Sequence, residues 1–271
     1  MLVDLHMHST FSDGRLSPQE LVDQGRLHGL TAMALTDHDE IAGIRPMQAY
    51  AGSDITIIAG TELSASYKGK DVHILGYNFD LDSSILQEYI RYYQDKRKER
   101  IVKMIALCQE QGYLISLEEL MALAPDTKAY GRPHIAQLLV QKGYAKDTNE
   151  VFDKILSSGG SCYVPKVKES VSQVIDVIHD AGGLAVLAHP KLIRNDDYVK
   201  DILRFPLDGL EVYHTSHGLG EEDRYRAMAE ARDLLITGGS DFHGIEGRYP
   251  AELGAYTVES ELIQEFMDQV L

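Results

Sequence analysis

The sequence predicts an α/β fold in which a parallel sheet alternates with helices, either as a barrel or as a doubly wound sheet. Seven aliphatic runs of strand length are typical of buried parallel strands. They occupy residues 2–5, 32–35, 55–59, 72–75, 184–188, 210–213 and 234–237. Helical patterns separate several of these runs. A chain of 271 residues with 44% hydrophobic side chains is long enough to bury a sizeable core.

Three helices are predicted between these strands. Ser17 is a suitable N-cap, Pro18 fits the first helical position, and Glu20 completes a capping box. A glycine at position 29 ends this helix. The apolar spacing over residues 171–178, closed by two glycines, predicts a second helix, and residues 221–233 predict a third, more polar one.

The middle of the chain departs from this alternation. From residue 83 to residue 160 the patterns are helical, with one long helix over 84–111, a capping box beginning at Ser116, and shorter helices over 134–142 and 148–156. We therefore expect residues 1–82 and 161–271 to form the α/β domain. Residues 83–160 are expected to form an all-helical subdomain inserted between the fourth and fifth strands.

Composition excludes several classes of protein. Lys and Arg number 26 against 42 Asp and Glu, and 26 − 42 gives a net charge of −16, which argues against binding of duplex DNA through a broad basic face. Only Cys108 and Cys162 occur, so a disulfide framework is excluded and a reducing cytosol is expected. The apolar runs are too short to span a membrane, and the first residues do not resemble a signal peptide. The predicted location is cytoplasmic, and the sequence does not predict an oligomeric state.

Histidines and carboxylates gather at the predicted strand ends. His6 and His8 are two residues apart on a strand, so their side chains share a face. Similar side chains follow or lie near the other strand ends, at Asp13, His38, Glu62, His73, His189, Asp241 and His243. In a parallel barrel the carboxyl ends of the strands form one rim. Independent core histidines would not be expected to fall there so often, so the sequence predicts a metal cluster.

The ligand types narrow the metal and the chemistry. Nitrogen and oxygen donors without thiolates suit Mn, and alternatively Fe or Zn. Nine candidates exceed what one ion can use, which predicts two or three divalent ions with a carboxylate such as Glu62 as a bridge. Closely spaced ions suit the hydrolysis of phosphate esters, because one ion generates hydroxide from water while the others hold the phosphoryl and leaving oxygens.

Short motifs in this sequence resemble, in order, those of the polymerase and histidinol phosphatase (PHP) family. They read DLHMHS at residues 4–9, SDG at 12–14, TDHD at 36–39, GTE at 60–62, AHP at 188–190 and GSDFH at 239–243, together with the strand around His73. The resemblance covers essentially the whole chain. It implies a distorted, TIM-like (β/α)7 barrel and a trinuclear metal site to which all nine residues named above contribute as ligands.

Within that family the inserted segment resembles a stand-alone bacterial branch, through GRPH at residues 131–134 and YVP at 163–165. This implies a cytosolic phosphoesterase that removes the 3′-phosphate from nucleoside 3′,5′-bisphosphates such as pAp. Degradation of short RNA from the 5′ end is implied as an additional activity of some members. Two alternatives remain open. One is a phosphatase for histidinol phosphate or another small phosphomonoester, and the other is a non-catalytic, metal-stabilised module that binds nucleotides.

Residues outside the metal cluster are candidates for binding the substrate. Arg132 offers a bidentate fork to phosphate oxygens, and His134 either binds phosphate or caps a helix. The insertion that carries them is expected to contribute to the substrate pocket. His214 and His217 follow the sixth predicted strand. Either one is expected to contact phosphate, to protonate the leaving oxygen or to orient a metal ligand. The same alternatives are open for Glu211, which lies in that strand. Basic residues at 91–100 either form a solvated helix face or steer an anionic substrate.

Overall fold

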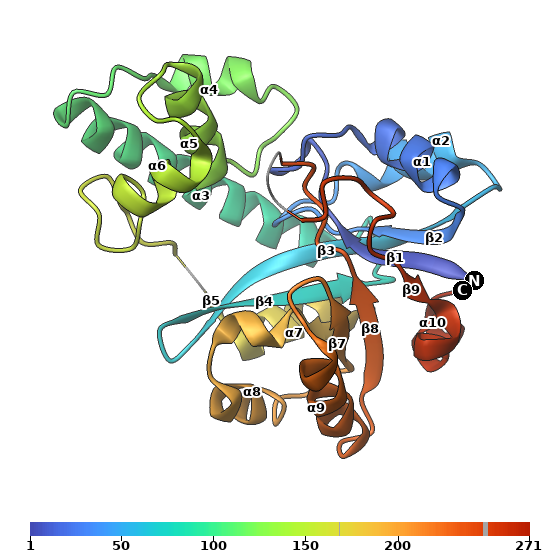
Figure 1. The fold of residues 1–271 in the computed structure, drawn as a ribbon. Helices are drawn as coiled ribbons and strands as arrows, with labels where there is room; N and C mark the ends of the chain where they lie inside the picture. The colour runs from blue at the N-terminus through green and yellow to red at the C-terminus, as the bar shows by residue number, and fades with distance from the viewer. Residues whose placement is uncertain (168, 246–248) are drawn as a thin grey trace. The chain divides into compact units, whose positions relative to one another are not determined.

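The computed structural model describes residues 1–167, 169–245 and 249–271. It divides into two compact units. Unit 1 consists of Met1–Tyr89 and Lys168–Leu271, and unit 2 consists of Ile90–Val167. In Figure 1 unit 1 includes the blue and cyan strands and the orange and red elements, whereas unit 2 includes the green and yellow-green helices. No helix among the described residues is long and apolar enough to cross a bilayer.

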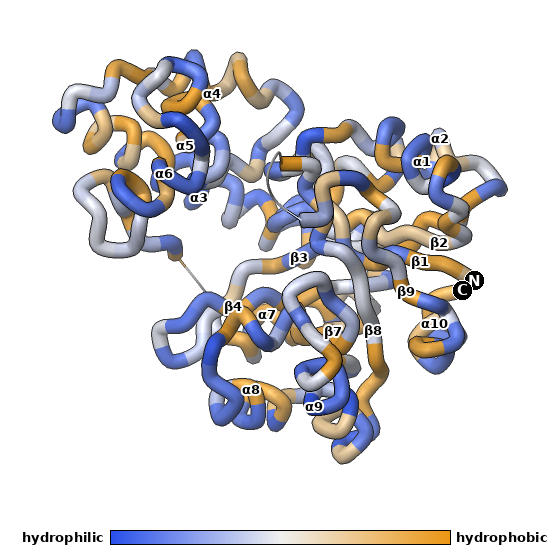
Figure 2. The backbone as a smooth tube through the Cα atoms, viewed as in Figure 1, coloured by the Kyte–Doolittle hydropathy of each residue, from blue (hydrophilic) through white to orange (hydrophobic). Residues whose placement is uncertain are grey.

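Unit 1 is built around a sheet that contains all seven predicted strands. The strands are β1 (Leu2–Met7), β2 (Leu30–Leu35), β3 (Thr56–Tyr67), β4 (Lys70–Tyr77), β5 (Glu169–Ser170), β6 (Leu184–Leu187), β7 (Gly209–His214), β8 (Leu235–Gly239) and β9 (Val258–Glu259). β5 and β9 were not predicted, because two residues are too few to show a strand pattern. Figure 2 shows β8 changing from hydrophobic at its start to neutral toward its end.

The described strands form one sheet that nearly closes into a barrel. Their order is β8-β7-β6-β4-β3-β2-β1-β9, with β5 paired to β3. β1 returns to the end of β8 through a bridge between Met7 and Phe242. The Asp241 amide donates to the His6 carbonyl at 2.8 Å, and the His8 amide donates to the Phe242 carbonyl at 2.9 Å. The predicted α/β class and TIM-like barrel are therefore confirmed.

The prediction of an entirely parallel sheet is wrong at the fourth strand. β4 runs antiparallel to both β3 and β6. The reason is the connection between β3 and β4, which consists only of Lys68 and Gly69, both with positive φ, at 47° and 79°. Such a two-residue turn forms a hairpin and leaves no room for a helical crossover. The register pairs Ser64 with His73, so this histidine enters from the middle of an antiparallel strand.

Helices surround the sheet of unit 1. They are α1 (Pro18–Leu27), α2 (Ile44–Ala51), α7 (Val171–Asp180), α8 (Asp196–Ile202), α9 (Leu219–Glu230) and α10 (Gln264–Val270), with 3-10 turns η1 (Pro190–Ile193) and η2 (Ser260–Ile263). The predicted capping box of α1 is present, since the Ser17 side chain accepts from the Glu20 amide and the Glu20 side chain accepts from the Ser17 amide. α2, α8 and α10 were not predicted. They have eight, seven and seven residues, which gives a weak periodic signal.

All regular secondary structure in the described part of unit 2 is helical. α3 (Ser84–Glu110) begins in unit 1 and continues into unit 2, followed by α4 (Leu117–Leu123), α5 (Arg132–Gln141) and α6 (Thr148–Lys154). The Ser116 capping box is also present. These helices surround a separate apolar core that includes Met104, Cys108 and Leu139. Unit 2 thus contains the helices expected in the insertion.

Candidate metal centre

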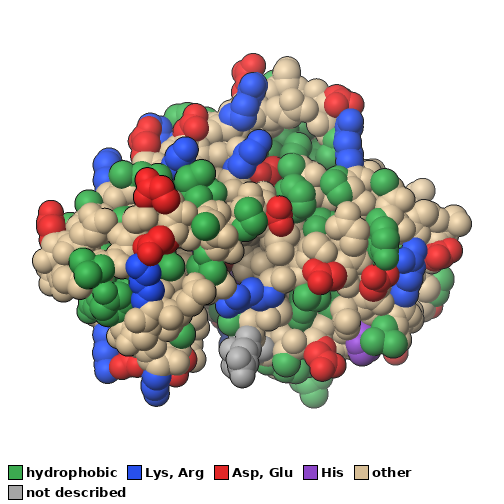
Figure 3. Space-filling model, turned by 90° about the horizontal axis from the view of Figure 1, so that it is seen from above, with side chains coloured by type: hydrophobic (Ala, Val, Ile, Leu, Met, Phe, Trp, Pro, Cys, Tyr) green, Lys and Arg blue, Asp and Glu red, His purple; other side chains and the backbone are tan. Residues whose placement is uncertain are grey.

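The nine histidines and carboxylates singled out in the sequence all belong to unit 1. His6 lies in β1, Glu62 in β3 and His73 in β4, while the others follow β1, β2, β6 or β8. They face inward: His6 and His8 have no exposed surface, and Glu62 is 1% exposed. On the face drawn in Figure 3 histidine is almost absent and charges of both signs are interspersed.

One group of four ligand atoms has the dimensions of an ion site. His8 Nε2 lies 3.1 Å from Asp241 Oδ1 and 3.3 Å from Glu62 Oε2. His6 Nε2 lies 3.5 Å from Asp241 Oδ1 and 3.6 Å from Glu62 Oε2. Ligand atoms about 2.0–2.1 Å from a tetrahedral ion lie about 3.3–3.4 Å apart, so these four atoms could surround one ion.

A second group lies next to the first. It comprises His8, Asp13, His38 and His243, whose ligand atoms all lie within 4.8 Å of one another. His243 Nε2 is 3.4 Å from Asp13 Oδ1, and the His8 and His243 rings stack with centroids 4.0 Å apart. His8 belongs to both groups, so any ions bound there would be close neighbours.

Glu62 connects these groups to the remaining histidines. Its Oε2 lies 2.8 Å from His38 Nδ1, and its Oε1 lies 2.6 Å from His73 Nδ1 and 2.8 Å from His189 Nε2. His38, Glu62 and His73 form a third candidate group, and His189 belongs to none of the candidate groups among the described residues. A carboxylate shared in this way is placed as a bridging ligand would be.

The side chains present fit divalent transition ions. His6 Nε2, Asp13 Oδ1 and Glu62 Oε2 are buried and have no hydrogen-bond partner within the described part of the chain. Buried polar atoms without a partner are costly, and an ion would satisfy them. The donors are imidazole nitrogens and carboxylate oxygens, which suit Mn, Fe or Zn.

The electrostatics of the cluster are those of ionised carboxylates among imidazoles. Burial alone would raise the pKa of Glu62, but His38 and His73 outweigh it and hold that pKa well below the usual range. Burial would also raise the pKa values of Asp13 and Asp241, but His243 together with other neighbouring imidazoles outweighs it and lowers both. Burial lowers the pKa of His8 to about 3, with a contribution from His243. Such a group binds a cation without first losing protons from its carboxyl groups.

Asp37 and Gly14 shape the loop that carries Asp13, and neither was singled out as a site residue. Asp37 accepts hydrogen bonds from the Ser9 amide at 2.7 Å, from the Ser9 hydroxyl at 2.6 Å, and from the Ser12 hydroxyl. It thereby fixes the loop that carries Asp13. Gly14 in that loop cannot carry a side chain, because a Cβ atom would overlap the His8 carbonyl oxygen. Asp37 directly precedes His38, and this adjacency was the available signal.

The histidines at the end of β7 and just after it, His214 and His217, have different surroundings. His214 forms a further candidate group with His6 and Glu211. His217 Nδ1 lies 2.7 Å from the Val212 carbonyl and so donates to it, while Nε2 is buried without a partner among the described residues. Burial lowers the pKa of His217 to about 4. His217 Nε2 is therefore a hydrogen-bond acceptor at neutral pH, and its contact with substrate stays a prediction.

The substrate-binding candidates of unit 2 are engaged in local contacts. The Arg132 guanidinium donates to the Leu156 carbonyl at 3.2 Å and lies 5.6 Å and 5.7 Å from the ring centroids of Phe152 and Tyr163. His134 Nδ1 accepts from the Gly131 amide at 3.0 Å, which is the capping contact weighed for it. Phosphate binding by these two residues stays a prediction.

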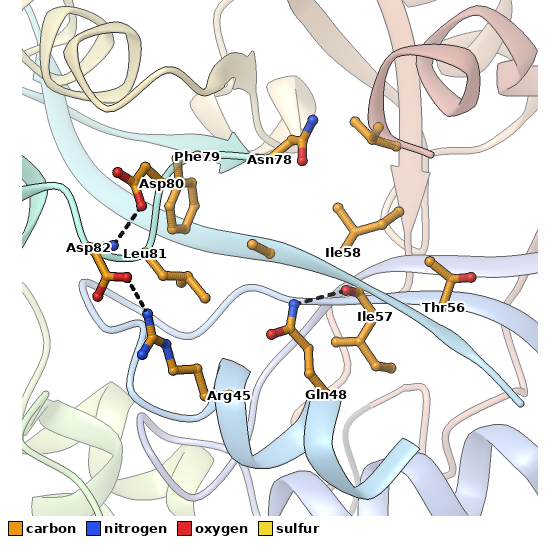
Figure 4. A pocket seen from close by; sticks show the side chains of 12 residues that line it. Arg45, Gln48, Thr56, Ile57, Ile58, Asn78, Phe79, Asp80, Leu81 and Asp82 are labelled. Carbon is orange, nitrogen blue, oxygen red and sulfur yellow. Dashed lines mark hydrogen bonds and ion pairs between the residues drawn. The ribbon is translucent and has the colours of Figure 1, made fainter. Parts of the chain in front are cut away.

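A separate pocket of about 370 Å³ lies between α2, β3 and the segment after β4. In Figure 4 the Arg45 side chain reaches Asp82, and the distance is 2.7 Å. The pocket contacts the first half of β3, whereas Glu62 lies in the second half. None of the nine histidines and carboxylates lines it.

Comparisons of sequence and of structure with known proteins indicate the same family. The model of the PHP domain matches residues 4–184. The chain is 32% identical over 251 residues to the 5′-3′ exoribonuclease Rnm of Escherichia coli, covering 90% of this chain and 85% of that protein. It is 33% identical over 249 residues to the 3′,5′-nucleoside bisphosphate phosphatase of Chromobacterium violaceum, covering 89% and 87%. A crystal structure from Bifidobacterium adolescentis, assigned to the metal-dependent phosphoesterases, superposes with a TM-score of 0.88 at 30% identity, covering 99% and 96%.

Proposed function

Since the chain belongs to the PHP domain family of metal-dependent phosphoesterases, we propose that it hydrolyses the 3′-phosphate of nucleoside 3′,5′-bisphosphates, releasing inorganic phosphate. The observation that carries this proposal is the set of buried imidazole and carboxylate groups that share Glu62. The relatives named above are similar over about nine tenths of this chain, with 90% and 89% covered, so the comparison includes the inserted helical segment.

We propose that the site binds two or three divalent ions, with Mn²⁺ preferred and Fe or Zn as alternatives. His6, His8, Glu62 and Asp241 would hold one ion, and His8, Asp13, His38 and His243 are the candidates for a second. His73 and His189 would complete the set beside Glu62. When bound, such ions lower the pKa of a water molecule and neutralise charge on phosphoryl oxygens.

The protein side chains then have distinct tasks. Glu62 would hold neighbouring ions when they are bound, because its two oxygens face different imidazoles. Asp37 keeps the Asp13 loop in position through the Ser9 and Ser12 contacts. His217 keeps an unprotonated but buried Nε2, which would have to become accessible before it could accept a hydrogen bond from a water or a phosphate oxygen. Its proposed role as general acid would require protonation after the substrate binds.

The substrate class rests on the named relatives and on charge. One relative is named for nucleoside bisphosphates and another for RNA degraded from the 5′ end. Both substrates carry a phosphate beyond the one that reacts. A chain of net charge −16 needs local cationic groups for such anions, and ions and arginines can supply them. We propose mononucleotide bisphosphates as the main substrates and short RNA as a further one.

A panel of phosphate esters assayed with Mn²⁺ tests the proposal. pAp and a short 5′-phosphorylated RNA are expected to be hydrolysed, and pAp should exceed histidinol phosphate in kcat/KM by about 10-fold or more. A single charge-assisted contact to the second phosphate, worth about 1.5–3 kcal/mol, gives a factor of about 10–150. Rapid hydrolysis of histidinol phosphate alone would select the alternative phosphatase. Absence of any turnover would select the non-catalytic binding module.

Replacement of Arg132 tests the predicted recognition of the second phosphate. Arg132→Ala should lower kcat/KM for pAp about 10- to 150-fold, mainly through KM, and should change p-nitrophenyl phosphate hydrolysis little. Arg132→Lys keeps the charge but not the bidentate fork, so it should recover only part of the loss.

The guanidinium also packs near Phe152 and Tyr163, so the thermal stability of both Arg132 variants is the control. Equal losses on the two esters would show that Arg132 serves the reaction centre or the fold.

A further inference from the structure

We infer that Glu211 is a positioning residue that fixes two histidines of the metal centre at once. It lies in β7, outside the nine predicted ligands, and it is fully buried. The inference rests on the proposed metal-dependent function, because it concerns how this chain prepares its ligands. Glu211 touches two histidines that come from different parts of the barrel.

The first contact sets the tautomer of His6. Glu211 Oε1 lies 2.9 Å from His6 Nδ1, and both side chains have no exposed surface. A carboxylate oxygen only accepts, so Nδ1 must carry the ring proton. In the neutral ring the lone pair is then on Nε2, which faces Glu62 Oε2 at 3.6 Å and Asp241 Oδ1 at 3.5 Å. That is the nitrogen an ion between these carboxylates needs.

The second contact holds the backbone of His189. Its amide donates to Glu211 Oε2 at 2.7 Å. His189 has φ 25° and ψ 63°, a positive φ that a non-glycine residue adopts only when its surroundings impose it. In this conformation its Nε2 lies 2.8 Å from Glu62 Oε1. One carboxylate group therefore orients an imidazole from β1 and another from the segment after β6.

The two contacts use different oxygens of Glu211, so a substitution that removes one acceptor oxygen must disturb one of them. Glu211→Gln keeps the volume of the side chain but has only one acceptor oxygen. The His189 amide can only donate, so it requires that oxygen and leaves the NH₂ group facing His6 Nδ1. His6 would then have to carry its proton on Nε2, where it blocks the ion. In the opposite rotamer the NH₂ group meets the His189 amide and displaces that histidine.

The chain offers a matched control. Asp208 Oδ2 accepts from the Ala185 amide at 2.7 Å and lies 2.7 Å from His179 Nε2, so it too joins a backbone amide to an imidazole. His179 and Asp208 belong to none of the candidate metal groups among the described residues. Asp208→Asn should therefore disturb a similar but partly exposed contact without affecting ion binding.

The experiment measures metal content and Mn²⁺ affinity of the full chain by elemental analysis and calorimetry. Glu211→Gln should weaken Mn²⁺ binding about 10- to 100-fold. Asp208→Asn should bind like the parent protein. Long-range ¹H–¹⁵N spectra of the zinc-loaded parent protein should show His6 protonated at Nδ1. This measurement uses the parent protein and does not depend on the folding of any variant.

The outcomes separate the inference from the proposed function. The role of Glu211 would be overturned by unchanged metal affinity in Glu211→Gln, or by a His6 proton on Nε2 in the parent protein. Neither result would contradict the proposed metal centre. Equal losses in Glu211→Gln and Asp208→Asn would also overturn it, by indicating general destabilisation. A parent protein that binds no divalent ion would instead contradict the proposed function.

Discussion

Glu62→Gln is expected to abolish hydrolysis of phosphate esters, with kcat/KM falling by about 10³-fold or more. Such a loss corresponds to about 4 kcal/mol of transition-state stabilisation, within the several kcal/mol that metal ions contribute. The physical reason is that Glu62 faces His6, His38, His73 and His189 at once. Glutamine has the same shape but lacks the charge and the second oxygen that a bridging ligand requires.

Metal content and thermal unfolding distinguish this loss from misfolding. Treatment with EDTA should inactivate the parent protein and Mn²⁺ should restore it, while Glu62→Gln should not respond to Mn²⁺. Added Mn²⁺ should raise the melting temperature of the parent protein, because it binds only the folded state, and should raise that of Glu62→Gln much less. Glu119→Gln removes a carboxylate that pairs with Lys142 in unit 2, and it serves as the control. A metal-free parent protein with full activity would contradict the prediction.

Local sequence patterns were sufficient for most strands and for the residues that meet at the rim. β1, β2, β6, β7 and β8 are aliphatic runs followed by polar residues, and the Met7–Phe242 bridge brings the ends of β1 and β8 together. The placement of His6, His8 and Asp241 in one group follows from that closure. Their binding of ions stays a prediction that the experiments above address.

The direction of β4 could not be predicted from its composition. Parallel and antiparallel buried strands have the same aliphatic content. The two-residue turn at Lys68 and Gly69 determines that β4 runs antiparallel to β3. His73 was nevertheless placed near the site, because it pairs with Ser64, whose side chain shares a face with that of Glu62. His73 thus lies beside Glu62 although the strand direction was predicted wrongly, and its role as a ligand stays a prediction.

The positioning residues were harder to predict than the candidate ligands. The sequence leaves Glu211 open, like His214 and His217, between contact with the substrate and orientation of a metal ligand. Its role depends on two contacts, to His6 and to the His189 amide, that join segments 205 and 22 positions away in the sequence. No local pattern encodes such contacts, because they arise only when β7 and β1 belong to the same barrel.

Hydrolysis of pAp is expected to yield 5′-AMP and inorganic phosphate, not 3′-AMP. The two phosphates of this substrate need different binding sites. The phosphate that reacts would lie at the cluster of candidate ligands, where bound ions would supply the activation of water and the neutralisation of the leaving oxygen. The other phosphate needs a cationic holder without metal, and Arg132 with His134, or the basic residues at 97–100, can supply it.

Binding of the second phosphate should also determine the rate. A remote anchor uses its binding energy to position the reacting ester, so a substrate that lacks this phosphate loses kcat/KM. 3′-AMP should therefore be hydrolysed about 10- to 150-fold less efficiently than pAp, which is the factor expected for one charge-assisted contact. In the Arg132→Ala variant this difference between pAp and 3′-AMP should largely disappear, whereas Arg132→Lys should keep part of it.

Product analysis by ³¹P NMR or chromatography decides which phosphate is cleaved. 3′-AMP as the main product would reverse the proposed orientation and place the 5′-phosphate at the ions. Equal rates for pAp and 3′-AMP would mean that no anchor exists, and the substrate would then be selected by the reaction centre alone. A 5′-phosphorylated dinucleotide extends the same reasoning, because its attacked phosphorus is a diester at the 3′ position of the first nucleoside. If the 5′-phosphate is the anchor, the dinucleotide should release 5′-AMP first, and removal of its 5′-phosphate should slow the reaction as much as it does for pAp.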